Sequence, residues 1–108
     1  MDPVHVAADW GLKVAVEDFG HAARTVAAEY EPRSKTIRVN ARVLGDRVDG
    51  ADVLAACVAH ELYHHLEYIG WVLSRPGGRY REARADAYAR RYFDLALDPA
   101  QVRRTLAR

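Results

Sequence analysis

The segment from residue 52 to residue 70, DVLAACVAHELYHHLEYIG, constrains the fold of this chain more than any other feature. Asp52 is a residue type that commonly precedes a helix, and Gly70 is one that commonly ends it. Between them, apolar residues lie on almost every side of the helix, and a helix with that pattern has to be buried. We therefore expect a central helix here, with the other elements packed around it.

The length of the chain limits what can surround that helix. The sequence has 108 residues, of which 50% are hydrophobic and 29% are charged, as in an ordinary globular protein. We expect a single domain, residues 1–108, with a core of one sheet and roughly three helices. A separate substrate-binding subdomain does not fit within this length.

The first half of the chain carries strand and turn signals. A short helix opened by Asp2-Pro3 is expected to end before Gly11. Apolar and charged residues then alternate over residues 12–17, which indicates a strand. Two further runs, 25–31 and 36–40, flank a polar turn and predict a β-hairpin. These signals together predict a small antiparallel sheet.

Two more helices are expected after the central one. A loop over Ser74–Gly78 should lead into a helix from about Tyr80 to Leu97, and Asp98-Pro99 should begin a short last helix. The predicted fold class is therefore α+β: a small antiparallel sheet packed on the central helix and on a second helix that carries Glu82. The residues expected on the packed face of that second helix are Ala83, Ala87, Tyr88 and Phe93.

The central helix contains the motif His60-Glu61-Leu62-Tyr63-His64. At 3.6 residues per turn, the two histidines lie about 40° apart on the helix surface, with Cβ atoms about 5–6 Å from each other. Two imidazoles so placed can bind one Zn²⁺ ion. Glu61 lies on the flank of the same face, where its carboxylate can take a proton from a metal-bound water. The motif predicts a zinc site with Glu61 as general base.

The alternative is a helix that carries its histidines for packing alone. The seven residues before the motif, 53–59, carry no charge, so the motif itself is expected to be buried. Burying two imidazoles and a carboxylate without partners is unfavourable by several kcal/mol. A bound metal ion would remove that cost, which favours metal binding.

A catalytic zinc site needs a third protein ligand. Glu82 follows His60 by 22 residues, at the start of the second helix, and is the main candidate. Asp86 lies one helical turn further on, where it can accept a hydrogen bond from the second ring nitrogen of a ligand histidine. Glu67 lies on the face of the histidines and is an alternative third ligand. Without a metal, Glu82 and Asp86 would be surface acids paired with arginines.

HELYH followed by Glu82-Ala83-Arg84-Ala85-Asp86-Ala87-Tyr88-Ala89 resembles the motifs of the gluzincins, zinc peptidases whose third ligand is a glutamate. The second motif resembles that of the ImmA/IrrE-type peptidases and of the single-domain minigluzincins. This resemblance covers roughly residues 25–95 and implies a minimal zincin-like fold with one Zn²⁺ per chain. It implies that His60, His64 and Glu82 are the metal ligands and that Glu61 is the general base. It also implies that Asp86 is the hydrogen-bond partner of a ligand histidine.

The sequence departs from related patterns in three ways. Larger gluzincins polarise the substrate carbonyl with a Tyr or His from a C-terminal subdomain, for which Tyr80 and His21 are the candidate substitutes here. Metzincins are excluded, because Glu67 and Gly70 stand where that class needs Gly and His. The segment Glu61-x-x-His64 also matches half of a di-iron motif, whose second half is missing.

Composition limits the binding partners and the cellular compartment that we expect for this chain. A net charge of +1 does not indicate nucleic acid, and no apolar run is long enough for a membrane span. One cysteine, Cys57, fits a reducing cytoplasm. We expect a cytoplasmic zinc endopeptidase that holds extended polypeptide against the edge of its sheet. The alternative is a non-catalytic regulatory or protein-binding module stabilised by zinc.

The charge is unevenly distributed along the chain. Residues 1–70 carry 7 basic and 11 acidic side chains, a net charge of −4, whereas residues 71–108 carry 9 arginines and 4 acidic side chains, a net charge of +5. The basic segment 98–108 of this chain, or of a neighbouring molecule, could therefore lie across the cleft and suppress activity. The alternative is an ordinary terminal helix packed on the surface.

Overall fold

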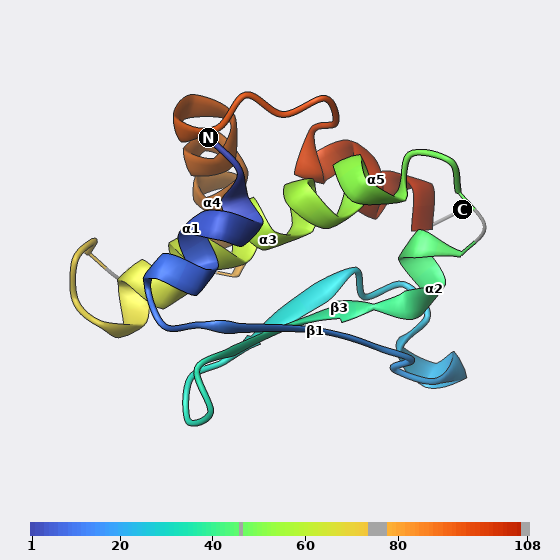
Figure 1. Cartoon of the computed structure of the whole chain (residues 1–108), viewed down its shortest axis with the longest axis horizontal. Helices are drawn as coiled ribbons and strands as arrows, with labels where there is room; N and C mark the ends of the chain where they lie inside the picture. The colour runs from blue at the N-terminus through green and yellow to red at the C-terminus, as the bar shows by residue number, and fades with distance from the viewer. Residues whose placement is uncertain (46, 74–77, 107–108) are drawn as a thin grey trace.

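The computed structural model describes residues 1–45, 47–73 and 78–106 (Figure 1). The elements, in chain order, are α1 (Pro3–Asp9), β1 (Lys13–Glu17), the 3-10 turn η1 (His21–Ala23), β2 (Ala28–Glu31), β3 (Thr36–Asn40), α2 (Ala41–Leu44), α3 (Gly50–Tyr68), α4 (Gly78–Tyr92) and α5 (Pro99–Leu106). The α+β class is confirmed. The strands form one layer, and α1 and α3 pack against one side of it, as Figure 1 shows.

The sheet has the strand order β1-β3-β2, and its pairing differs from the prediction. The predicted hairpin is confirmed, because β2 pairs with β3 in antiparallel register. β1, however, pairs with β3 in parallel, so the sheet is mixed and the predicted antiparallel sheet is wrong. β3 takes the centre because its inward side chains, Ile37 and Val39, are fully buried, whereas Val16 of β1 is 48% exposed. Strand patterns in the sequence do not say on which side of β3 the first strand lies.

α1 forms for the local reasons that its sequence predicts. Oδ1 of Asp2 accepts a hydrogen bond from the backbone N–H of Val4 at 3.0 Å, and Pro3 occupies the first helical position. The helix ends at Asp9, and Gly11 follows with a φ of +75°, which suits glycine.

The central helix α3 spans Gly50–Tyr68 and begins three residues before the predicted start. Asp49, not Asp52, precedes it, and the Asp49 carboxylate binds Arg47 instead of capping the helix. α3 packs against every other helix and against β2 and β3, so its central place is confirmed. In the described parts of the chain, no helix combines the length and apolar character needed to cross a bilayer.

α4 ends at Tyr92, five residues before the predicted end. Its buried residues are Ala85, Asp86 and Ala89, whereas the predicted inward residues Ala83 and Ala87 are exposed. Tyr88 is half-buried and Phe93 is buried, as predicted. Most of the predicted loop before this helix, residues 74–77, lies outside the described residues.

The last helix begins where it was predicted. Asp98 precedes α5, and its carboxylate accepts a 2.9 Å hydrogen bond from the backbone N–H of Ala100. Pro99 and Val102 are buried, so α5 is fastened to the core and contacts α3 and α4.

Candidate metal centre

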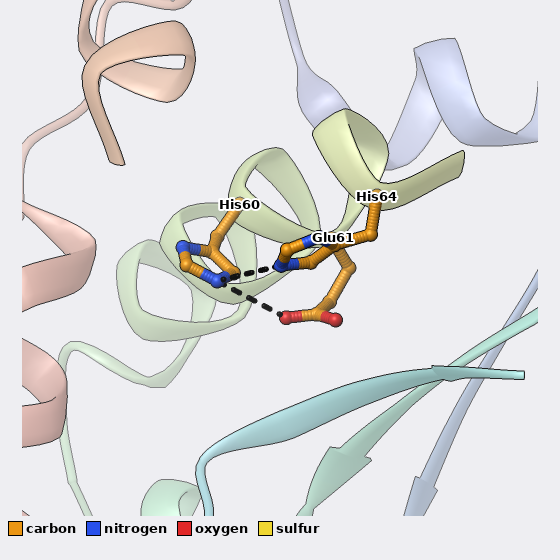
Figure 2. A group of neighbouring side chains, drawn as sticks. All are labelled: His60, Glu61 and His64. Atoms are coloured by element: carbon orange, nitrogen blue, oxygen red, sulfur yellow. Dashed lines mark hydrogen bonds and ion pairs between the residues drawn. The ribbon is translucent and has the colours of Figure 1, made fainter. Parts of the chain in front are cut away.

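His60 and His64 point their imidazoles toward each other from one face of α3, as Figure 2 shows. Their Nε2 atoms are 3.3 Å apart. Potential ligand atoms of His60, Glu61 and His64 all lie within 4.8 Å of one another, which would allow the group to hold a metal ion. The helix forces this arrangement, because residues four apart lie on the same face.

Glu82 brings a carboxylate from α4 to both histidines. Its Oε2 lies 2.7 Å from Nε2 of His60, and its Oε1 lies 3.2 Å from Nε2 of His64. The contacts with the two imidazoles lower the pKa of Glu82 despite its partial burial. The three side chains named from the sequence as ligands therefore converge on one point.

Glu61 lies beside this point but further from His60 than Glu82 does. Its Oε2 is 3.6 Å from Nε2 of His60, an ion-pair contact that is longer than a hydrogen bond (dashed in Figure 2). The residue is buried, and burial raises the pKa of its carboxyl against the opposing effect of the two histidines. A buried carboxylate with a raised pKa at the edge of a ligand set is suited to accepting a proton.

Asp86 contacts the opposite nitrogen of His60. Its Oδ1 lies 2.7 Å from Nδ1, so the imidazole is held from behind while Nε2 faces Glu82. Burial raises the pKa of Asp86, but the hydrogen bonds from Arg103 and His60 outweigh burial and hold it at about 2. Burial also disfavours the charged form of His60, yet the hydrogen bonds to Asp86 and Glu82 raise its pKa to about 9.

Glu67 has the same relationship to the second histidine, a role that the sequence interpretation missed. Its Oε1 lies 2.8 Å from Nδ1 of His64. It therefore lies behind His64, whereas Glu82 lies at the Nε2 side where a third ligand is needed. The available signal was the spacing of three residues, which places Glu67 one helical turn after His64.

The third histidine of α3 and the two candidates for polarising a substrate carbonyl lie elsewhere. His65 is buried, and its Nδ1 is 2.7 Å from the hydroxyl of Tyr30, so it is a packed residue. Tyr80 is 68% exposed, and His21 is an exposed residue of η1. Neither is among the described residues that line the cavities beside the site. The structure therefore does not bring either candidate into these two cavities.

Two cavities flank the site and share Ala28, Glu61 and Glu82 as lining residues. The first, of about 330 Å³, is lined mainly by small residues and by Arg103 of α5. The second, of about 500 Å³, extends past His64 toward Tyr30. Both are bordered by β2, which is an edge strand of the sheet. The site therefore lies midway along a groove that follows this edge.

The donor set fits a divalent cation. Two imidazole nitrogens and a carboxylate are the ligand types of a zinc site. When ionised, the four carboxylates around the histidines and the two arginines bound to them leave a net formal charge of −2, which a divalent cation would balance. The residues counted are Glu61, Glu67, Glu82, Asp86, Arg81 and Arg103.

Comparisons of the chain with models of protein families, with curated proteins and with solved structures find no match. A functional assignment therefore depends on the site itself. The observations that bear on it are the convergence of His60, His64 and Glu82 and the groove that passes beside them.

Proposed function

We propose that this chain is a zinc-dependent endopeptidase of the gluzincin type, with a minimal zincin-like fold. His60, His64 and Glu82 would hold one zinc ion. The observation that carries the proposal is the contact of one Glu82 carboxylate with the Nε2 atoms of both histidines. A histidine pair on a helix recurs by chance, but a carboxylate from a second helix, 22 residues later, meets both rings only if the tertiary structure brings it there.

The residues around this set have complementary tasks. A zinc ion in such a site supplies Lewis acidity, which lowers the pKa of a water molecule and polarises a carbonyl group. Glu61 would accept the proton from water and deliver it to the leaving amine. Asp86 and Glu67 would keep the two imidazoles oriented by binding their Nδ1 atoms.

The groove supports a polypeptide as substrate. An extended chain can pair with the edge strand β2 through backbone hydrogen bonds, and the side chains that face the enzyme can enter the two cavities. Because a cavity lies on each side of the site, substrate residues could be held on both sides of the scissile bond. That arrangement favours cleavage within a chain over removal of its terminal residues.

A second candidate function is a non-catalytic module stabilised by zinc. The observation that favours it is the position of Glu61, whose carboxylate lies within 4.8 Å of the histidine nitrogens. If Glu61 became a fourth ligand, the coordination sphere would be closed, as in structural zinc sites.

The substitution Glu61→Gln distinguishes the two functions. Zinc content and cleavage of an unfolded, fluorescently labelled protein should be measured for the parent, for this variant, and for Glu17→Gln as a control on the exposed end of β1. The endopeptidase proposal expects the variant to keep one zinc per chain and lose cleavage, while the control keeps both. A loss of zinc affinity in Glu61→Gln would support the closed site, and absence of zinc from the parent would exclude both functions.

A further inference from the structure

Each of the two histidines is the end of a chain of three side chains. Nδ1 of His60 contacts Asp86, and both carboxylate oxygens of Asp86 accept hydrogen bonds from the guanidinium group of Arg103, one of them at 2.8 Å. The second chain starts at Nδ1 of His64 and runs through Glu67 to an arginine of α4. The same order, histidine to carboxylate to arginine, therefore occurs twice.

The second chain has matching contacts. Arg81 donates from Nη2 to Oε1 of Glu67 at 3.1 Å and from Nε to Oε2 at 3.3 Å. Its histidine contact is the 2.8 Å pair between Glu67 and His64. Each arginine thus engages both oxygens of its carboxylate, the paired geometry that fixes the plane of a carboxylate as well as its position.

Burial explains why this geometry matters. The side chains of Asp86 and Glu67 are 7% and 3% exposed, whereas those of Arg103 and Arg81 are 34% and 41% exposed. The carboxylates are largely withdrawn from water, so their orientation depends on the groups that bind them. Removing an arginine would take its hydrogen bonds from both carboxylate oxygens, leave the histidine contact on one of them, and free the carboxylate to turn away from the histidine.

We propose that Arg81 and Arg103 are positioning residues of the metal centre, each acting through its carboxylate on one ligand histidine. This inference rests on the proposed metal binding, and it makes α5 part of the centre because that helix supplies Arg103. The alternative is that the two arginines form ordinary ion pairs that stabilise the fold without affecting the metal.

Zinc affinity measured by competition with a chromophoric chelator tests the proposal. The variants are Arg81→Met and Arg103→Met, with Arg79→Met and Arg104→Met as controls on exposed positions of the same helices. We expect each test variant to lose roughly tenfold in affinity, the low end of the range for residues that support a metal ligand. The controls should bind like the parent. Circular dichroism checks folding, and Arg103→Lys gives a milder change that still cannot bind both oxygens of Asp86.

Double variants show whether each arginine acts through its carboxylate. Nη1 of Arg103 also lies 3.3 Å from Nδ1 of His60, but both nitrogens carry protons when Nδ1 donates to Asp86, so the arginine is expected to act through Asp86. Arg103→Met should therefore weaken zinc binding in the parent and have little further effect in Asp86→Asn. The same is expected of Arg81→Met in Glu67→Gln. With cobalt in place of zinc, the visible absorption bands should shift in the arginine variants and stay unchanged in the controls, because the orientation of the imidazoles affects the ligand field.

Three results would overturn the inference. The first is parent-like affinity and an unchanged cobalt spectrum in folded Arg81→Met and Arg103→Met, with the parent binding zinc normally. The second is an equal loss with and without the carboxylate, since the arginines would then act by another route. The third is a parent chain that binds neither zinc nor cobalt, which would overturn the proposed function together with this inference.

Discussion

Nδ1 of His60 donates a 2.7 Å hydrogen bond to Oδ1 of Asp86, which lies 26 residues later in the sequence. The direction of this bond follows from the low pKa of Asp86, about 2, because an ionised carboxylate can only accept. With the proton on Nδ1, the Nε2 lone pair becomes available to a metal once Nε2 gives up its own proton. The bond therefore prepares His60 as an Nε2 ligand.

The substitution Asp86→Ala should weaken zinc binding by roughly 10–100-fold while the fold is retained. The loss is expected because His60 would no longer be held at Nδ1 and Arg103 would lose its partner in α4. The measurement is the zinc dissociation constant, with circular dichroism as the folding check. Asp94→Ala, at an exposed position after α4, is the matched control. Parent-like affinity in Asp86→Ala would make Asp86 a structural acid only.

Zinc binding should release protons at neutral pH. In the metal-free protein the pKa of His60 is about 9, above the value of about 6.5 of an unperturbed histidine, so the imidazole is protonated at pH 7. Zinc has to displace a proton from Nε2, and its affinity should therefore rise by about tenfold per pH unit per displaced proton and level off above about pH 9. Calorimetry in two buffers with different ionisation enthalpies measures this release. Binding heats that do not depend on the buffer would contradict it.

The raised pKa of His60 should also affect the stability of the metal-free protein. Stability should fall as the pH rises, whereas zinc affinity should increase. A group with a raised pKa in the folded state stabilises that state fully below its unfolded pKa. The contribution of His60 should therefore be complete below about pH 6.5 and disappear as the pH rises through about 9. Urea unfolding of the metal-free chain at several pH values tests the sign of this dependence.

Cys57 should be unreactive in the folded protein. It is buried on α3, one turn before His60, and burial raises the pKa of its thiol to about 12. At neutral pH the thiol is therefore protonated, and only a thiolate reacts readily with alkylating reagents. Labelling by a thiol reagent should be slow in the native state and become fast in urea. Rapid labelling under native conditions would show that α3 opens at this point.

Local periodicity explains why the core of the site could be predicted. The separation of His60 and His64 by four residues places them together on any α-helix, wherever that helix lies in the fold. The same rule placed Glu82 and Asp86 on one face of α4. Each of these two predictions depended only on the geometry of a single helix. The contact of Glu82 with the histidines depended in addition on the packing of α4 against α3.

One error arose because the packed face of α4 was predicted from its apolar residues alone. The inward stripe of α4 consists of residues 82, 85, 86 and 89, and Phe93, directly after the helix, continues the same regular pattern. Counting Glu82 and Asp86 as inward residues would have selected Ala85 and Ala89 in place of Ala83 and Ala87. The apolar residues alone formed a different pattern, so the packed face was misassigned.

Other long-range partners could not be predicted from local patterns. Nothing near Arg103 in the sequence distinguishes it from Arg104, yet the first binds Asp86 and the second is exposed. The parallel pairing of β1 with β3 is a similar case, because it depends on which edge of the central strand is left for β1 to fill. Both features follow from the packing of elements that are distant in the chain.

Removal of the C-terminal helix should weaken zinc binding and at the same time test autoinhibition. A chain that ends at Leu97 lacks the buried Val102 and Arg103, which donates to Asp86 and lines the smaller cavity. We expect its zinc affinity to fall by at least as much as that of Arg103→Met. A chain that ends at Leu106 keeps α5 and is the matched control.

Peptidase activity of these chains should be compared at equal zinc occupancy, after a folding check. Autoinhibition by the basic segment predicts higher activity per bound zinc in the chain that ends at Leu97, because the segment carries positive charge beside the acidic groups of the groove. Equal or lower activity per bound zinc would mean that α5 only builds the wall of the cavity and positions Asp86. Measuring affinity and activity separately is necessary here, because loss of Arg103 lowers the zinc content and would hide a gain in activity if only total cleavage were followed.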